Sequence, residues 1–510
     1  MKSPHKRIVL GGFVLGGLGL ALAACGGVQA DGPSVLLVTV DCLRADHVGA
    51  YGYERDTTPN LDAFAAEAAL FERAYSHAPF TAPSHASLFT GVLPHSHGLV
   101  FWGHRIDPSV PSLASLFGDA GYATGAFQNH PGLPPTGLLD DFDTVVTETT
   151  GPWPDTVENF FEWVDGRDRP FAAWVHLWDV HRPYGFREWT RDSLDLYQDE
   201  RREPGRLPYA EVGFGPKVQD PRVGRIEAHY NLNRDERAGA LPVAYGGPNR
   251  RFTPADWEYI ANRYDNAVRY ADAGLKALFD GLEERGIADD TVVVITADHG
   301  ETLTEREEVW FTHDPFLFEE TLHVPLLIRF PGGRHAGLRT DALARGIDVL
   351  PTLLGAARVA APGELQGRDL DDVLAGRDTA PALLLAETRT KTAKASSART
   401  EEGWLEHRQA VTDGRHKLIW DLNTNQGAFF DLVADPGERT NLLAGEGDAP
   451  DEAIALYREL ERLRQLLPLA PVVSNAMSCE QYWQMVDLGY IDEIPGKCVN
   501  ADGSRKVGGA

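Results

Sequence analysis

The stretch SVLLVTV, Ser34–Val40, is the segment from which we predict the fold class of this chain of 510 residues. It is a continuous apolar run rich in valine, which is typical of a strand buried on both faces of a parallel sheet. A similar run, TVVVITA, covers Thr291–Ala297, and PFAAWVHLW at 170–178 and VPLLIRF at 324–330 are two further candidates. The sequence therefore predicts several buried strands that are far apart along the chain.

Helical patterns separate these strands. The clearest one starts at Thr253 and Pro254, a pair suited to a helix cap and first turn, and it ends at Gly286. Its apolar residues recur at steps of three and four: Ile260, Tyr264, Val268, Ala271, Leu275, Leu278 and Leu282. Strands that alternate with helices predict an α/β fold with a large, mostly parallel sheet flanked by helices, which we place at 34–355.

Three other regions differ in composition from these elements. Residues 187–249 are polar and rich in proline and glycine, which fits either a surface insertion or a lid over the site. Residues 356–470 contain short strand-like runs with turns and a final amphipathic helix, so we expect a small antiparallel-sheet subdomain with a helix. Residues 471–510 form a tail, in which we expect a disulfide between Cys479 and Cys498 if the protein is exported.

The N-terminal segment has the pattern of an export signal. MKSPHKR is basic, residues 8–24 are apolar, and the run ends in Leu-Ala-Ala before Cys25, which resembles a bacterial lipobox. We expect a signal peptide at 1–24, a lipid on Cys25 and a tether at 25–33. The protein would then be exported and lipid-anchored to the cell envelope, at the periplasmic face or the outer membrane. The alternative is an ordinary signal peptide cleaved near Ala24 or Ala30.

The charge balance excludes one class of partner. The chain has 48 Lys and Arg and 75 Asp and Glu, for a formal net charge of −27. This balance argues against non-specific nucleic-acid binding and against electrostatic adsorption to anionic lipid, so we expect no nucleic-acid partner.

Polar residues follow two of the predicted strands. Asp41 comes directly after Ser34–Val40, and Asp298 and His299 come directly after Thr291–Ala297. Ligands of open α/β sheets bind beyond the carboxyl ends of the strands. Two carboxylates and an imidazole at one such edge predict a divalent-metal site. Either aspartate alone could instead cap the helix that follows it.

The stretch APFTAPSHASLFTG, residues 78–91, predicts a short helix that ends at Gly91. Pro83 suits its first position, which puts Thr81 just ahead of the helix N-terminus, where free N–H groups favour an anion. A hydroxyl there that touches a metal can become nucleophilic. From these residues alone, a simple capping role for Thr81 is favoured.

Six segments, in this order, resemble the sulfatase family of the alkaline phosphatase superfamily. They are VTVDCLRADHVGAYGY, TAPSHASLFTG, VHLWDVHRPY, ITADHGE, HDPFLFEETLHVPLLIRFPG, and GRHKLI together with FFDLVADPGERTNLL. The resemblance implies an alkaline phosphatase-like fold and one divalent metal ion. The residues that would contact the metal by this resemblance are Asp41, Asp298, His299 and Thr81. Thr81 would occupy the nucleophile position, and His181 and His313 would contact the anionic ester or protonate the leaving group.

The chain departs from the family pattern at several of these positions. The family nucleophile is a cysteine or serine converted to formylglycine, a route closed to Thr81, so we expect no formylglycine. His85 replaces the arginine of the signature and Asn129 replaces a lysine, and we expect both to bind substrate. Cys42 replaces a second metal-site aspartate. His299 replaces an asparagine, and this nitrogen ligand favours Mn²⁺ or Zn²⁺ over the Ca²⁺ of the family.

These observations predict a metal-dependent sulfatase-family hydrolase of sulfate or phosphate esters. The expected substrate is a small anionic ester or a sulfated or phosphorylated glycan. One alternative is a phosphodiesterase or phosphoryl-group transferase acting on envelope glycans or lipids. Another is a non-catalytic glycan-binding relative, which His85, Asn129 and Cys42 favour and the retained metal residues oppose.

Overall fold

The structure is a computed structural model of the whole chain. It describes residues 30–466 except 102–103, 131, 148–151, 183, 185–253, 304, 307–312, 314, 391–405 and 446, and also 473–474, 479, 483 and 498. The expected signal peptide, Cys25 and the 187–249 insertion therefore lie outside the described residues. Within the described part, no helix is both long enough and apolar enough to cross a membrane.

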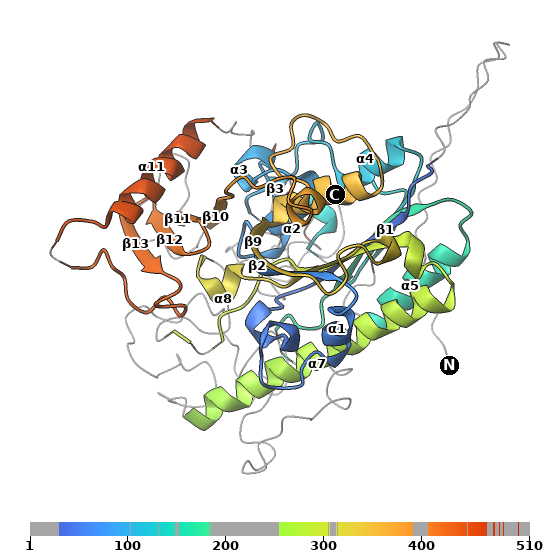
Figure 1. Cartoon of the computed structure of the whole chain (residues 1–510), viewed down its shortest axis with the longest axis horizontal. Helices are drawn as coiled ribbons and strands as arrows, with labels where there is room; N and C mark the ends of the chain where they lie inside the picture. The colour runs from blue at the N-terminus through green and yellow to red at the C-terminus, as the bar shows by residue number, and fades with distance from the viewer. Residues whose placement is uncertain are drawn as a thin grey trace.

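An eight-stranded sheet forms the centre of the molecule (Figure 1). Its strand order is β5-β4-β6-β1-β7-β8-β2-β9, and β8 alone among them runs antiparallel to its neighbours. The strands are β1 (Ser34–Val40), β2 (Ala69–Tyr75), β4 (Ala123–Gln128), β5 (Thr144–Thr147), β6 (Phe171–Leu177), β7 (Thr291–Ala297), β8 (Leu326–Arg329) and β9 (Arg339–Arg345). The large, mostly parallel sheet predicted from the apolar runs is confirmed.

Strand β1 lies at the middle of the sheet and contributes to both of its faces. Leu36 and Val38 belong to one hydrophobic core, whereas Val35 and Leu37 belong to another. Successive strand residues point to opposite faces, so this division shows that both faces are covered. The continuous apolar run SVLLVTV is the sequence signature of that double burial.

Helices cover the two faces of this sheet (Figure 1). The described α-helices are α1 (Pro59–Phe64), α2 (Thr81–Thr90), α3 (Pro94–His97), α4 (Leu113–Asp119), α5 (Trp153–Asp165), α7 (Pro254–Glu284), α8 (Glu319–Leu322), α9 (Val349–Ala356), α10 (Leu370–Leu374) and α11 (Asp451–Leu466). Short 3₁₀ helices lie at η1 (Ala45–His47), η2 (Gly49–Tyr51), η3 (Pro134–Thr136), η6 (Ala288–Asp290), η7 (Pro331–Gly333) and η8 (Gly346–Asp348). Helices α1, α5 and α7 pack on one face, and α2, α4 and α9 pack on the other.

A second sheet lies in the C-terminal part. It is antiparallel and contains β10 (Leu384–Thr390), β11 (Glu406–Thr412), β12 (His416–Asp421) and β13 (Gln426–Asp431). Helix α11 packs on it through Leu456 and Leu460, which share a core with Val411 and Leu418. The predicted small antiparallel sheet with a helix is therefore present.

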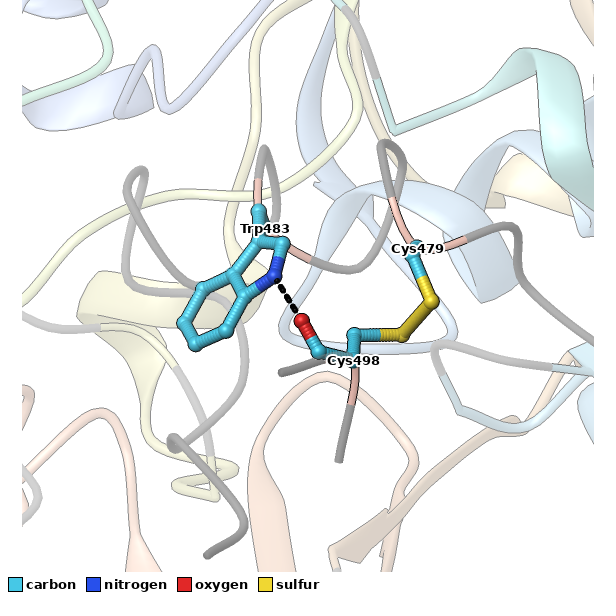
Figure 2. Close-up of a disulfide and its surroundings, with 3 residues drawn as sticks. All are labelled: Cys479, Trp483 and Cys498. Atoms are coloured by element: carbon cyan, nitrogen blue, oxygen red, sulfur yellow. Dashed lines mark hydrogen bonds between the residues drawn. A yellow bond between two sulfur atoms is a disulfide. The ribbon is translucent and has the colours of Figure 1, made fainter. Parts of the chain in front are cut away.

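The described residues of the tail return to the main body. Strand β14 (Val473–Ser474) pairs with β3 (His104–Arg105) in a two-stranded antiparallel sheet. Cys479 and Cys498 form a disulfide, and the Trp483 Nε1–H donates a hydrogen bond of 2.8 Å to the Cys498 carbonyl (Figure 2). The disulfide joins two residues 19 positions apart, as the cysteine spacing had suggested.

Candidate active site

The register of the sheet places the two predicted metal-site aspartates side by side. Strands β1 and β7 pair in parallel with Val40 opposite Ala297, so the next residues, Asp41 and Asp298, leave the sheet together. Both side chains are fully buried. Two buried carboxylates at one point repel each other unless a cation or hydrogen-bond donors compensate them.

One oxygen of the Asp298 carboxylate accepts hydrogen bonds from the backbone, and the other does not. Its Oδ1 accepts hydrogen bonds from the backbone N–H of His299 at 2.9 Å and of Cys42 at 3.3 Å. Its Oδ2 has no hydrogen-bond donor among the described residues, although it is buried. A buried carboxylate oxygen left in this way is a natural ligand for a cation.

The His299 ring is oriented by its own backbone. Its Nδ1–H donates to the Gly300 carbonyl at 2.8 Å, so in the neutral ring the lone pair lies on Nε2. This Nε2 is 3.4 Å from Asp298 Oδ2 and 3.4 Å from Thr81 Oγ1. Three atoms that can bind a metal therefore converge: a carboxylate oxygen, an imidazole nitrogen and a hydroxyl oxygen.

Thr81 is the first residue of α2, and not a residue just ahead of it as the sequence suggested. The N-cap is Phe80, whose side chain makes no capping bond, and Pro83 is the third helical residue. The Thr81 hydroxyl faces His299, so the capping role favoured by the local sequence is not the one observed. The site therefore has a hydroxyl directly at a helix N-terminus, where backbone N–H groups favour an anion.

Two hydrogen bonds fix the loops that carry these residues. The Ser84 hydroxyl of α2 donates to the Asp298 carbonyl, which ties the helix to the end of β7. The Tyr264 hydroxyl of α7 donates to the Cys42 carbonyl at 2.7 Å, which ties the end of β1 to the long helix. Cys42 has a left-handed backbone with φ of 58°, an unusual conformation for a non-glycine residue.

A buried hydrogen-bond network around Thr39 contacts the site from within the sheet. The Thr39 hydroxyl contacts Trp174 Nε1 at 2.9 Å, His85 Nε2 at 3.0 Å and His176 Nδ1 at 2.8 Å. His176 Nε2 then lies 3.2 Å from Asp41 Oδ2. The network thus connects the core of the sheet to one of the two metal-site aspartates.

His85, which the sequence analysis predicted to bind substrate, lies inside the protein on α2. Its Nδ1–H donates to the Thr81 carbonyl at 2.9 Å and its Nε2 contacts Thr39, so both ring nitrogens have partners inside the protein. The ring is fully buried beside Trp174, with 5.0 Å between centroids. His85 therefore contacts the start of α2 with both ring nitrogens facing protein atoms, and its role in substrate binding stays a prediction.

His176 is the site residue that the sequence analysis missed. The sequence analysis assigned it no role, whereas its Nε2 contacts Asp41. The register explains the contact, because His176 on β6 lies opposite Thr39 on β1, one residue before the strand ends. The available signal was a histidine inside an otherwise apolar, fully buried strand.

The two other predicted histidines lie on the same side of the sheet. His181 follows β6 and His313 precedes α8, and each has 2% of its surface exposed. Their ring centroids are 5.8 Å apart, and the His299 and His313 centroids are 4.4 Å apart. The sequence-distant histidines therefore gather around His299.

Asn129 follows β4 and is fully buried. Gln128, the last residue of β4, lies opposite His176 in the register of β4 and β6. His130, the residue after Asn129, lies 5.1 Å from Trp178 and 6.4 Å from His181 between ring centroids. Asn129 is thus at the same edge of the sheet as the other predicted site residues.

Burial controls the ionisation of several groups here. It lowers the pKa of His85 to about 3 and that of His176 to about 4, so both rings are neutral at neutral pH. Burial, and then the neighbouring carboxylates led by Asp41, raise the pKa of the Cys42 thiol well above its usual value. Burial also raises the pKa of Glu301 to about 7. The site therefore holds little positive charge of its own.

The donor atoms fit a divalent metal. Three sets of buried side chains have ligand atoms within 4.8 Å of one another: Cys42, His181 and His313; Asp41, Cys42 and His299; and His85, His176 and Asp298. Mixed nitrogen, oxygen and sulfur donors suit a transition metal better than Ca²⁺, which prefers oxygen ligands. Within these sets the His85 nitrogens are already engaged, so Asp41, Asp298 and His299 remain the fitting ligands beside Thr81.

Comparison with known proteins identifies the class. The sulfatase family model matches residues 33–359, and the model described as N-sulphoglucosamine sulphohydrolase, C-terminal, matches residues 306–465. The chain belongs to the sulfatase family, within the alkaline phosphatase-like superfamily, and is a sulfatase-like hydrolase. Proteins of this family generally bind a divalent metal ion.

Named relatives cover most of the chain. A Delta 4,5-hexuronate-2-O-sulfatase of Bacteroides thetaiotaomicron is 27% identical and covers 83% of this chain and 87% of its own. Arylsulfatase A of Homo sapiens is 26% identical and covers 88% of this chain and 91% of its own.

Solved structures share the fold. The phosphonate monoester hydrolase of Agrobacterium radiobacter superposes with a TM-score of 0.65 at 20% identity, over 87% of this chain and all of its own. A putative sulfatase from Bacteroides thetaiotaomicron gives 0.65 at 21% identity, over 87% of this chain and 96% of its own.

Proposed function

We propose that this protein is a metal-dependent hydrolase of sulfate or phosphate esters in which the Thr81 hydroxyl is the nucleophile. One observation carries the proposal: Thr81 Oγ1, at the N-terminus of α2, lies 3.4 Å from His299 Nε2. The unpaired Asp298 Oδ2 lies 3.4 Å from the same nitrogen. Relatives named as sulfatases support the reaction class.

Each residue has a separate task in this reaction. Asp41, Asp298 and His299 would hold a divalent ion, which supplies a lowered pKa for the Thr81 hydroxyl and a counter-charge for the ester. The N–H groups at the start of α2 orient the anionic ester oxygens. His181 or His313 donates a proton to the leaving oxygen.

The atoms balance over two steps. The Thr81 hydroxyl releases its proton to solvent, and Oγ1 forms a bond to sulfur or phosphorus. The bond from that atom to the leaving oxygen breaks, and the leaving oxygen takes a histidine proton. Water then attacks the same sulfur or phosphorus and gives one proton to the histidine. The bond to Thr81 Oγ1 breaks, the anion is released, and Oγ1 takes a proton from solvent to restore the hydroxyl. A sulfated or phosphorylated glycan, or a small anionic ester, is the substrate class that we propose.

The identity of residue 81 supports a second candidate function. A threonine cannot become formylglycine, so Thr81 would form a covalent ester that must be attacked from outside. If the acceptor is a glycan or lipid hydroxyl and not water, the protein is a phosphoryl-group transferase. If the acceptor is water and the substrate is a phosphate diester, it is a phosphodiesterase.

A paired assay tests the nucleophile. The purified protein would be assayed with Mn²⁺, Zn²⁺ and Ca²⁺ on 4-nitrophenyl sulfate and on bis(4-nitrophenyl) phosphate. Thr81→Ala should lower kcat by at least about 10³-fold on the preferred ester. Thr81→Ser, which keeps a hydroxyl, should retain much more activity. Unchanged turnover in Thr81→Ala would show that another group is the nucleophile, and the ratio of the two esters would assign the substrate anion.

We also propose that the protein is exported and held at the cell envelope by a lipid on Cys25. The lipobox-like sequence before Cys25 supports the anchor, and the disulfide between Cys479 and Cys498 fits an oxidising compartment. Cys25→Ser should move the protein from the membrane pellet to the soluble fraction. Equal recovery of both forms in the pellet would count against the anchor.

A further inference from the structure

A second cluster of metal-binding side chains lies beside the Thr81 site. Cys42, His181 and His313 come from the ends of β1 and β6 and from the segment before α8, and all three are buried. Their ligand atoms lie within 4.8 Å of one another. Ligand atoms about 2.0–2.3 Å from a tetrahedral zinc ion lie about 3.3–3.8 Å apart, so small side-chain movements would close these three around an ion.

Two of these side chains are already oriented for binding. The His181 Nδ1–H donates to the Arg182 carbonyl at 2.7 Å, so the neutral ring presents the lone pair of Nε2. Cys42 is held by the Tyr264 hydroxyl on its carbonyl and by Asp298 on its N–H. Its left-handed backbone, with φ of 58°, has a conformational cost that the fold must offset, as is common at functional sites.

The charge around Cys42 favours a cation. Asp41, Asp298 and Glu301 are fully buried and each interacts electrostatically with the Cys42 thiol. The Tyr184 side chain is a hydrogen-bond partner of the buried Glu301 carboxylate. Arg182 offsets part of the Glu301 charge, but one divalent ion leaves excess negative charge once an anionic ester binds.

We propose that Cys42, His181 and His313 bind a second divalent ion, Zn²⁺ or a similar transition metal, next to the ion held by Asp298 and His299. One thiolate and two imidazoles are zinc-type donors, and three protein ligands leave a fourth position for substrate. Binding expels the thiol proton to solvent. The proposal rests on the proposed ester hydrolysis and changes one part of it. Stabilisation of the leaving oxygen is assigned to this ion in place of a proton from His181 or His313, because a ring that binds the ion through Nε2 has no proton there to donate. The leaving oxygen then takes its proton from solvent.

Cobalt reports the sulfur ligand directly. The full-length protein would be stripped with a chelator, reconstituted with Co²⁺, and examined for its metal content and its near-ultraviolet thiolate-to-cobalt charge-transfer band. We expect two ions per chain and a clear band in the parent. Cys42→Ser should abolish the band and lower the content to about one ion, whereas Asp298→Ala should lose an ion and keep the band.

Controls separate the possible results. Cys25→Ser should keep the band, which excludes a contribution from the one other cysteine outside the disulfide. If Cys42→Ser loses its near-ultraviolet circular dichroism, His313→Gln replaces it and should likewise lose one ion. A content of one ion in the parent, or an intact band in Cys42→Ser, overturns the second site. Thr81-dependent hydrolysis with one ion per chain would support the proposed function and contradict the second metal site. Two ions per chain without turnover on either ester would support the second metal site and contradict the proposed function.

Discussion

At the scale of single residues, the Thr39 hydroxyl connects three buried side chains next to the predicted metal ligands. It lies within hydrogen-bond distance of Trp174, His85 and His176, and His176 contacts Asp41. A ligand carboxylate is oriented by such outer contacts. We therefore assign to Thr39 the positioning of both α2 and Asp41, through His85 and His176.

Removing this hydroxyl should weaken metal binding as well as folding. Thr39→Val keeps the shape of the side chain but leaves its three partners unsatisfied, so the free energy of unfolding should fall by about 1–3 kcal/mol. Metal affinity should fall by about 10–100-fold. Denaturant unfolding and a competitive chelator titration measure the two effects.

Thr136→Val is the matched control. It removes a buried hydroxyl that donates to the Leu133 carbonyl at 2.6 Å, away from this network. It should destabilise the fold and leave metal affinity unchanged. Equal metal affinity in Thr39→Val and the parent would remove the positioning role.

A second residue-scale prediction concerns pH. Burial lowers the pKa of His77 to about 3, below the usual value of 6.5, while its Nδ1–H donates to the Leu385 carbonyl. The unfolded chain therefore binds the proton first as the pH falls below about 6.5. Stability from this group is complete above that pH and decreases toward pH 3, by up to about 1.4 kcal/mol per pH unit.

His77→Gln removes the titrating ring and keeps an N–H donor. The free energy of unfolding, measured with denaturant between pH 7 and pH 4, should depend less steeply on pH in this variant. Parallel curves for variant and parent would show that His77 does not contribute to the acid sensitivity.

At the scale of elements, a buried charge cluster joins the two sheets of the molecule. Lys417 on β12 is fully buried and contacts Glu319 of α8 at 2.9 Å and Glu438 at 3.0 Å. Tyr75 of β2 donates to the same Glu319 at 2.9 Å. The C-terminal sheet is thus attached to the main sheet through an ion pair with little solvent around it.

Lys417→Met should remove the ammonium group that Glu319 and Glu438 share, while Arg306 Nη2 stays 3.3 Å from Glu438 Oε2. We expect a loss of about 3–5 kcal/mol in the free energy of unfolding, because an uncompensated buried charge costs far more than a surface pair contributes. Lys276→Met, which breaks the exposed pair with Asp280, should cost only about 0.5 kcal/mol. Similar denaturation midpoints for the two variants would contradict this role of Lys417.

At the scale of the whole molecule, the proposed metal ion would link strands that are distant in sequence. Asp41 and Asp298 lie 257 positions apart and meet only when β1 and β7 pair. A cation between them therefore binds the folded chain and not the unfolded one. Ligand binding of this kind stabilises the folded state by about 2.7 kcal/mol at a hundredfold excess over Kd.

This linkage predicts a metal-dependent melting temperature. Adding Zn²⁺ or Mn²⁺ to chelated protein should raise the Tm of the parent, and Asp298→Ala should lose most of the increase. Asp280→Ala, which changes an exposed carboxylate, should keep it. The same increase in Asp298→Ala and the parent would show that the ion binds elsewhere.

Much of the fold could be predicted from local sequence patterns. The strands at Ser34–Val40 and Thr291–Ala297 have the predicted bounds, because doubly buried strands are continuous apolar runs. Helix α7 begins at Pro254, as the Thr253-Pro254 pair indicated. The start of α2 was misplaced by two residues, because Pro83 also fits the third position of a helix.

The sequence by itself determined which chemical groups stand at the strand ends: Asp41, Asp298 and His299 follow apolar runs whose direction and burial are local properties. Only the tertiary structure decided which atoms face one another. It engaged both nitrogens of His85 and brought His176 to Asp41 across 135 positions of sequence. It also placed Cys42 beside His181 and His313. The physical reason is that these contacts depend on the register between strands and on hydrogen bonds to the Thr39 hydroxyl. Neither produces a periodic pattern in the sequence.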